Sequence, residues 1–442
     1  MNPRNNPPVR QNISREMFFE NAKRISANPL TRISNRTRTR VSSILANEGL
    51  YNAFVDVHMH AFTNKNIPRD FAITSTGISR DLLELASKIF VKRTHHLVNS
   101  SPAEIIDDLL SHYQQTLHLQ ENDSKPELFL VLLMMDMERG ITGGVEEDFI
   151  GQMKKVLELK NDYQFSYESD VDNFTGKDHL LPFLAIDPNN PDAFSLFLSA
   201  FAKTINDTDI DELEQTTPFV GIKIYPSLGY LPNHPTLMDI FEVCEEKSIP
   251  VTAHAGGERT HTSYKVMNLP RSEYDATNDR YIDKWDAPLV ALEKNRNKYY
   301  KPILLYPDRW RPVLDANPEL KLNIAHFGSS DEWANNNDPD TWNSLDQTFR
   351  LIQDFSNVYA DFSYAFAKKK NMQYLKRRID GDRYLATRVM YGSDFYLNEI
   401  MKGTVTEHLN NVLNIMPRPD YPNIYFSNAI RFMFEKVVIQ FN

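Results

Sequence analysis

Histidine and aspartate residues recur in this sequence where short apolar runs end. Two of them, His58 and His60, are two apart in one run, so both side chains point to the same face of a strand. Three similar positions follow in later runs: His254, His326 and Asp394. Imidazole and carboxylate groups are ligands that suit a borderline divalent ion such as Zn²⁺. A single strand-end histidine is more often a hydrogen-bonded core residue, but their joint occurrence predicts a metal site.

Other polar residues lie close to these positions. Lys223 and Tyr225 share one face of the run FVGIKIYP (219–226), and Arg259 and His261 follow His254 within seven residues. A lysine in a strand is usually an edge or snorkelling residue. We nevertheless interpret Tyr225, Arg259 and His261 as candidates for substrate binding, because they fall beside the expected metal site.

Eight apolar runs supply the strands that would position these residues, and helical patterns separate most of them. Alternating strands and helices predict a parallel sheet buried on both faces, and eight units are the number that closes a (β/α)8 TIM barrel, an α/β fold. In such barrels the carboxyl ends of the strands meet at one mouth. The runs are FVDVHMH (54–60), LFLVLLMMD (128–136), LLPFLAIDP (180–188), FVGIKIYP (219–226), IPVTAHAG (249–256), LKLNIAHFG (320–328), VYADFS (358–363) and VMYGSDF (389–395).

The length of 442 residues fits three ordinary domains or one enlarged barrel. Two long connections, 61–127 and 257–318, follow predicted strands, and we expect them to be insertions on the carboxyl-end face. Without them and a polar N-terminal arm at 1–48, about 265 residues remain, close to the roughly 250 of a plain barrel. The sequence therefore favours an arm at 1–48 and one barrel at 49–442.

Composition excludes several classes of protein. Cys244 is the only cysteine, so no internal disulfide can form, and no apolar run reaches the roughly 18 residues of a membrane span. The net charge of −10 combines a basic arm of +6 with a body of −16, which disfavours nucleic acid as a partner. The arm has no apolar core of a secretory signal. We therefore expect a cytoplasmic protein with a small-molecule substrate, no membrane or nucleic-acid partner, and homodimerisation as an open alternative.

The motifs DVHMH, AIDPNNPDAF, VGIKIYPSLGY, IPVTAHAGG, NIAHFG, YGSDF and NIYFSNAIRFMF occur in this order. The series resembles the amidohydrolase superfamily, and within it the amidohydrolase-related group that includes aminocarboxymuconate-semialdehyde decarboxylase. The resemblance covers about residues 54–434. It implies a metal-dependent barrel in which His58, His60, His254 and Asp394 bind the metal, and His326 is the catalytic histidine beside it.

Lys223 leaves the number of metal ions open. In binuclear relatives a carboxylated lysine on the fourth strand bridges two ions, and His254 and His326 would then hold the second one. In members with a GIKIYP-type motif the lysine is more often unmodified, so we favour one Zn²⁺, with other divalent metals as alternatives. An unmodified Lys223 would bind a substrate carboxylate or pair with an acid.

The resemblance and the ligand types together predict a reaction. Zn²⁺ can lower the pKa of a bound water to about 7, and Asp394 would then accept its proton as general base. His326 would polarise the scissile carbonyl or hold the water. We therefore predict a metal-dependent hydrolase that cleaves a C–N or C–O bond, in an amide, lactone or ester, of a small polar or carboxylated substrate. The alternatives are a non-oxidative decarboxylase or hydratase on the same site, and a non-catalytic barrel that serves as a binding or regulatory module.

Overall fold

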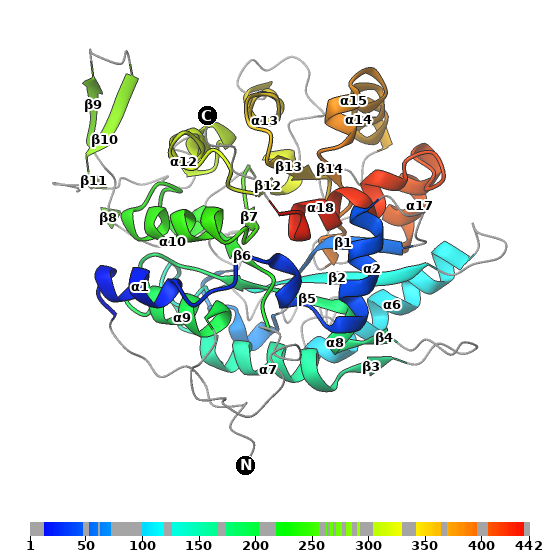
Figure 1. Cartoon of the computed structure of the whole chain (residues 1–442), viewed down its shortest axis with the longest axis horizontal. Coiled ribbons are helices and arrows are strands. Elements are labelled where there is room, and N and C mark those ends of the chain that lie inside the picture. The colour runs from blue at the N-terminus through cyan, green and yellow to red at the C-terminus, as the bar shows by residue number, and fades with distance from the viewer. Residues whose placement is uncertain are drawn as a thin grey trace.

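The structure is a computed structural model, shown in Figure 1. It describes residues 13–46, 53–60, 62–71, 100–118, 126–165, 174–202, 218–256, 262, 266–267, 271–275, 280–284, 290–291, 304–328, 342–363, 369–395 and 405–436.

Eight parallel strands in the described part form one sheet at the centre of the molecule. In their order around the sheet they are β1 (Ala53–His60), β2 (Glu127–Leu133), β5 (Leu180–Ala185), β6 (Gly221–Ile224), β7 (Val251–Ala253), β12 (Leu322–Ile324), β13 (Val358–Asp361) and β14 (Val389–Met390). Hydrogen bonds join the last strand region to the first: the Val57 amide donates to the Tyr391 carbonyl (3.0 Å), and the Asp394 amide donates to the His58 carbonyl (2.8 Å). The predicted (β/α)8 barrel is therefore confirmed.

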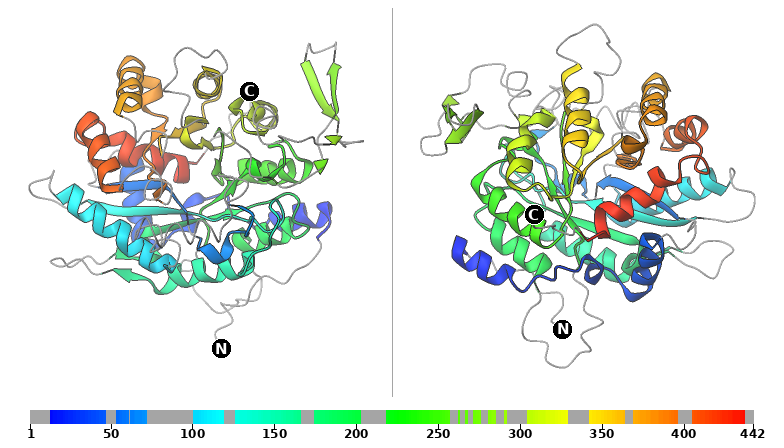
Figure 2. Two further views of the ribbon diagram at one scale, coloured as in Figure 1. Left: turned by 180° about the vertical axis from the view of Figure 1, so that it is seen from behind. Right: turned by 45° about the horizontal axis from the view of Figure 1, so that its top comes forward.

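A helix follows each barrel strand, and these helices surround the sheet (Figures 1 and 2). In chain order they are α6 (Pro102–His118), α7 (Phe149–Asp162), α9 (Ala193–Phe201), α10 (Pro235–Glu246), α12 (Arg311–Ala316), α13 (Trp342–Asp354), α14 (Lys369–Gly381) and α17 (Val405–Ile415). In α6, buried Ile105, Leu109 and Tyr113 recur every four residues, the spacing of one helix face. The two long connections contain α6 and α12, so the outer ring accounts for part of their length.

Several shorter strands and helices lie outside the barrel strands and the outer helices. The second long connection also holds two antiparallel pairs, β8 (Val266–Met267) with β11 (Val290–Ala291), and β9 (Arg271–Asp275) with β10 (Arg280–Lys284). The others are β3 (Gln164–Phe165), β4 (Phe174–Thr175), α8 (Gly176–His179), α15 (Arg383–Ala386), η3 (Asn64–Asn66), η4 (Pro226–Leu228), η5 (Pro307–Trp310) and η6 (Ala325–Gly328). No helix within the described ranges is long and apolar enough to cross a membrane.

The described part of the N-terminal arm packs against the barrel. It forms α1 (Arg15–Ala22), η2 (Pro29–Arg32) and α2 (Asn35–Leu45), and α1 contacts α9 and α10. The η2 and α2 segments contact α18 (Asn428–Phe434), which follows the π-helical turn η10 (Asn423–Ser427). Arg32 is buried, and its guanidinium donates to the backbone carbonyls of Lys247 and Ser248.

The barrel interior is apolar up to its mouth. Inward-facing residues of the strands, among them Val55, Val131 and Phe183, form one cluster with Val41 and Ile44 of α2 and with side chains of α18. The arm and α18 therefore close the end of the barrel opposite the carboxyl ends of the strands. A packed interior leaves the mouth as the place where polar side chains can gather.

His408 in α17 gives a testable pH dependence of stability. Its ring is buried and stacks near Tyr391, and neither ring nitrogen has a hydrogen-bond partner in the described structure. Burial lowers the pKa of His408 to about 4, whereas an unfolded histidine titrates near 6.5. As the pH falls through this window the unfolded chain takes up the proton first, so acidification lowers the free energy of unfolding by about 1.4 kcal/mol per pH unit for this group.

Replacing His408→Leu is expected to remove that contribution. Urea unfolding between pH 6.5 and 4.5 should show a smaller loss of stability in the variant than in the wild type. The control is Asn414→Leu, because Asn414 is exposed on the same helix and does not titrate. Equal pH slopes for the wild type and His408→Leu would refute the assignment.

Candidate metal centre

A β-bulge in β1 directs two neighbouring residues toward the barrel interior. Asp56 pairs with Leu130 and Met59 with Leu132, so Val57 and His58 together oppose the single residue Val131. The bulge re-aims His58: strict alternation after the inward-facing Val57 would turn His58 outward. The rings of His58 and His60 consequently approach each other, with centroids 5.1 Å apart.

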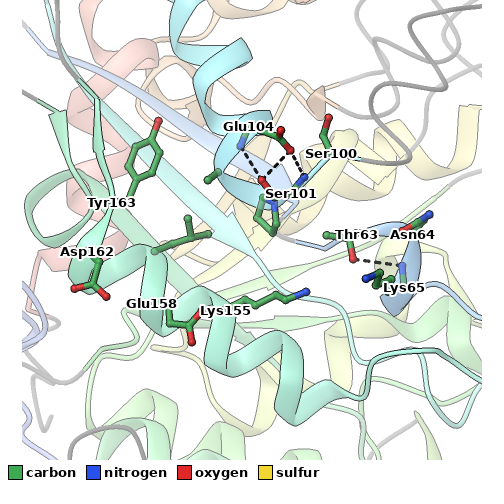
Figure 3. Close-up of a pocket in the computed structure, with 13 residues that line it drawn as sticks. Thr63, Asn64, Lys65, Ser100, Ser101, Glu104, Lys155, Glu158, Asp162 and Tyr163 are labelled. Atoms are coloured by element: carbon green, nitrogen blue, oxygen red, sulfur yellow. Dashed lines mark hydrogen bonds between the residues drawn. The ribbon is translucent and has the colours of Figure 1, made fainter. Parts of the chain in front are cut away.

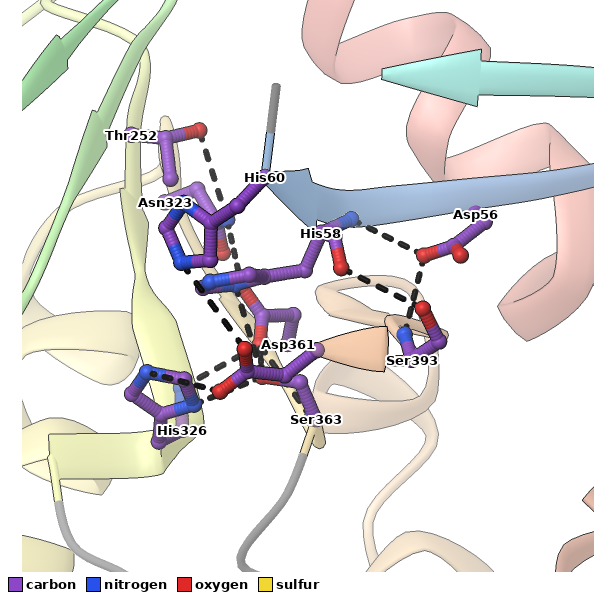
Figure 4. A network of polar contacts seen from close by, with 10 residues as sticks. Asp56, His58, His60, Thr252, Asn323, His326, Asp361, Ser363 and Ser393 are labelled. Carbon is purple, nitrogen blue, oxygen red and sulfur yellow. Dashed lines mark hydrogen bonds and ion pairs between the residues drawn. The ribbon is translucent and has the colours of Figure 1, made fainter. Parts of the chain in front are cut away.

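His58, His60 and Asp394 form a compact set at the mouth. Figure 4 shows the two histidines of this set. One ligand atom from each residue can be chosen so that all three lie within 4.8 Å of one another. The Asp394 carboxylate lies 3.8 Å from His60 Nε2 and 3.9 Å from His326 Nε2. Four buried atoms of the set have no hydrogen-bond partner among the described residues: His58 Nε2, His60 Nδ1 and both Asp394 oxygens.

Leaving such atoms unsatisfied costs about 1–3 kcal/mol each. A divalent cation would satisfy several of them at once, and two imidazoles with one carboxylate are a donor set that such ions accept. The residues present therefore fit a metal ion.

The backbone at this mouth adopts strained conformations. Asp394, His326 and Phe327 have φ values of 45°, 58° and 53°, in the left-handed region that side chains other than glycine rarely occupy. A Cβ on Gly392 would lie 2.6 Å from the Cβ of His58, so this position requires glycine. Such strain persists only where surrounding contacts impose it, and it clusters at functional sites.

Asp361, at the end of β13, holds two of the histidine segments. Its Oδ2 accepts from Asn323 Nδ2 (2.8 Å) and contacts His58 Nδ1 (3.2 Å). Its Oδ1 accepts from the backbone amide of His326 (3.2 Å) and from the hydroxyl of Ser363 (2.5 Å). Although Asp361 also lies close to His58 and His326, these hydrogen bonds occupy its carboxylate, so we interpret it as a partner of ligands.

Asp56 ties β1 to the segment that carries Asp394. Its Oδ1 accepts from the backbone amides of His58 (3.0 Å) and Ser393 (2.9 Å), and its Oδ2 accepts from the Tyr113 hydroxyl (2.7 Å). Asp56 therefore fixes the position of the first strand, which carries His58, relative to the segment that carries Asp394.

Lys223 and His254 lie beside the compact set. Lys223 in β6 is 1% exposed, and its Nζ has no hydrogen-bond partner among the described residues. The His254 ring lies 5.3 Å from the His326 ring and 4.5 Å from that of Tyr225, measured between centroids. His254 is thus at the same mouth, outside the two sets of three ligand groups found among the described residues.

Burial dominates the electrostatics of this site in the absence of metal. It lowers the pKa values of His60 and His326 well below the ordinary value, and the neighbouring His58 ring adds to the effect. Burial raises the pKa of Asp394 to about 6 and lowers the pKa of Lys223 to about 8. Burial also opposes ionisation of Asp361, but contacts with His58 and His326 outweigh it and lower the pKa of Asp361. Neutral imidazoles are the form in which histidine binds a metal.

The structure thus brings together most of the residues selected from the sequence. His58, His60, His326 and Asp394 converge, Lys223 and Tyr225 come from β6 and its end, and His254 lies beside them. Arg259 and His261 lie outside the described residues. The sequence reasoning missed Asp361, although this aspartate lies at the end of β13, and it also missed Asn323 and Ser363.

A hollow lined by other residues is shown in Figure 3. It has a volume of about 540 Å³ and lies between η3, the start of α6 and α7. Lys65, Glu104 and Lys155 are among its lining residues. It includes none of the residues selected from the sequence.

A parallel eight-stranded barrel with imidazole and carboxylate groups at the carboxyl ends of its strands defines a class: (β/α)8 barrels with a candidate metal centre. The family model described as Amidohydrolase matches residues 207–409, which include Lys223, His254, His326 and Asp394. This match agrees with the resemblance to the amidohydrolase superfamily over these residues, which are a little under half of the chain. No curated protein sequence matches the chain.

Several solved structures are similar to this chain at low sequence identity. One is 2,6-dihydroxybenzoate decarboxylase from Rhizobium (13% identity, TM-score 0.43, covering 87% of this chain and 99% of that one). Another is a probable 2-pyrone-4,6-dicarboxylic acid hydrolase from Acinetobacter baumannii with citric acid bound (12%, 0.46, 86% and 98%). A third is a dihydroxybenzoic acid decarboxylase from a Polaromonas species with bound manganese and 2-nitroresorcinol (12%, 0.45, 86% and 97%).

Proposed function

We propose that this chain is a metal-dependent hydrolase that cleaves a C–N or C–O bond of a small carboxylated molecule. The observation that supports it most is the group of buried, unpartnered atoms on His58, His60 and Asp394, which fits a divalent ion. We propose one Zn²⁺, held by these three residues with His254 beside them. When bound, such an ion supplies Lewis acidity and lowers the pKa of a coordinated water to about 7.

Asp394 is the proposed general base. Its carboxylate has no hydrogen-bond donor in the described structure and faces both His60 and His326. One oxygen can therefore serve the metal while the other accepts a proton from water and later delivers it to the leaving group. The hydrogen bond between the Asp394 amide and the His58 carbonyl fixes this side chain at the mouth.

His326 and Lys223 are proposed to act on the substrate. The neutral His326 ring lies 3.9 Å from Asp394, where it can accept a hydrogen bond from the attacking water and hold it in place. The buried Lys223 ammonium has no acceptor among the described residues, so a substrate carboxylate would satisfy it. This pairing is the reason for proposing a carboxylated substrate.

The unpaired Lys223 also supports a second candidate function. A carboxylate held against this ammonium beside the metal site is itself a group that the substrate could lose. The second candidate is therefore a non-oxidative decarboxylase, in which His326 Nε2 takes up a proton from water and delivers it to the carbon that loses the carboxyl group.

The test is a substrate panel with zinc-loaded protein. It contains lactones, N-acyl amides and unsaturated or aromatic acids, each paired with a methyl ester that lacks the free carboxylate. We expect mass spectrometry to show bond cleavage of a carboxylated lactone or amide, and Asp394→Asn to lower kcat by roughly 100- to 10,000-fold. Release of CO2 instead would support the decarboxylase, and no turnover by fully loaded protein would support a binding module.

A further inference from the structure

We propose that Ser363 is a positioning residue: it relays a hydrogen bond from Asp361 to His326 and thereby fixes which nitrogen of His326 carries the proton. The three side chains lie in sequence at the barrel mouth (Figure 4). The inference rests on the proposed function only in placing His326 at the reacting centre. The contacts that carry it are independent of any substrate.

The direction of the relay follows from the number of available protons. The Ser363 hydroxyl has one proton, and it donates this proton to Asp361 Oδ1 at 2.5 Å. The same oxygen lies 2.6 Å from His326 Nδ1. Because the hydroxyl proton is already used, the hydroxyl must accept here, and His326 Nδ1 must be the donor. In the neutral ring, Nε2 then carries the lone pair.

Asp361 makes this arrangement rigid. It accepts from the backbone amides of His326 and Ser363, at 3.2 Å each, so both ends of the relay are fixed to the same carboxylate. Asn323 holds its other oxygen. The left-handed backbone at His326 is therefore held where its ring can reach Ser363, and Nε2 faces Asp394 at 3.9 Å.

The same carboxylate orients the neighbouring ligand. His58 Nδ1 lies 3.2 Å from Asp361 Oδ2 and 3.4 Å from the Ser363 hydroxyl, whose proton is used elsewhere. His58 therefore donates from Nδ1, which leaves its buried Nε2 free for a metal. One carboxylate thus sets two tautomers, directly for His58 and through Ser363 for His326, and both rings present Nε2 to the site.

Histidine tautomers can be measured directly. Long-range ¹H–¹⁵N spectra of protein labelled with ¹⁵N-histidine distinguish Nδ1–H from Nε2–H rings, and the His326 signals are identified by their loss in His326→Asn. We expect the Nδ1–H form in the wild type, a mixture or the Nε2–H form in Ser363→Ala, and recovery of the Nδ1–H form in Ser363→Thr, which restores the hydroxyl. Once a substrate is known, Ser363→Ala should lower kcat about 10- to 100-fold with little change in KM.

The outcomes separate this inference from the proposed function. An Nε2–H ring in the wild type, or an unchanged Nδ1–H signal in Ser363→Ala, would overturn the relay even if metal binding and turnover are found. An Nδ1–H ring in a wild type that binds no metal would support the relay while the proposed function fails. If Ser363→Ala does not fold, the spectra of the wild type and of Ser363→Thr still show which nitrogen of His326 carries the proton.

Discussion

Purified His58→Ala/His60→Ala protein is expected to contain no tightly bound divalent metal, whereas the wild type should contain about one equivalent. Substituting a mere partner of a metal ligand weakens binding roughly 10- to 100-fold, so losing two ligands should weaken Zn²⁺ binding by more than about 1,000-fold. The two rings lie 5.1 Å apart on β1 and supply two of the three closest donor groups. Elemental analysis after purification without added metal measures this directly.

Thermal unfolding is a second test of whether His58 and His60 bind the metal. A ligand present at 1,000 times its Kd stabilises the folded state by about 4 kcal/mol. A chelator should therefore lower the Tm of the wild type and leave that of the double variant unchanged. His112→Ala is the matched control, because His112 contacts Thr406 away from the site. A double variant that keeps one equivalent of metal would rule out this site.

Lys223→Met is expected to separate substrate binding from metal binding. The variant removes a buried ammonium that has no acceptor among the described residues, so the metal-free protein should gain about 1–3 kcal/mol in free energy of unfolding. A charge-assisted hydrogen bond contributes about 1.5–3 kcal/mol, so kcat/KM for a carboxylated substrate should fall roughly 10- to 100-fold. Urea unfolding and steady-state kinetics measure the two effects.

The metal content of Lys223→Met shows whether Lys223 is carboxylated in the wild type. It should stay at one equivalent if Lys223 is unmodified, and it should fall from two to one if a carboxylated lysine bridges two ions. Lys321→Met is the control, because Lys321 is also buried but its Nζ donates to the Glu435 carbonyl. That substitution should lower stability and leave kcat/KM unchanged. Unchanged kinetics in Lys223→Met would contradict a role in substrate binding.

The barrel could be predicted from the sequence because parallel strands buried on both faces are apolar along their whole length. Strand ends in such a barrel share one mouth, so the sequence also predicts that His58, His326 and Asp394 lie close together. The same argument could have identified Asp361, because this residue also lies at the end of a barrel strand, β13.

Other features depend on geometry that the residue types do not encode. The bulge that turns His58 inward is an irregularity of strand pairing, and the left-handed backbone at His326 is imposed by contacts from Asp361 and its neighbours. Arg32 illustrates a related limit: an arginine in a polar arm is expected at the surface, yet two backbone carbonyls hold it in the interior. Tertiary contacts decide such positions.

The closed end of the barrel also bears on how the chain is made. The segments η2 and α2 lie near the start of the described chain and α18 lies near its end, and they pack together over the same apolar interior. On the ribosome, the arm is synthesised first and its packing partner α18 nearly last. The interior side chains of β1 and β2 are therefore fully covered at that end only after about residue 434 has emerged, and until then part of this apolar surface is exposed.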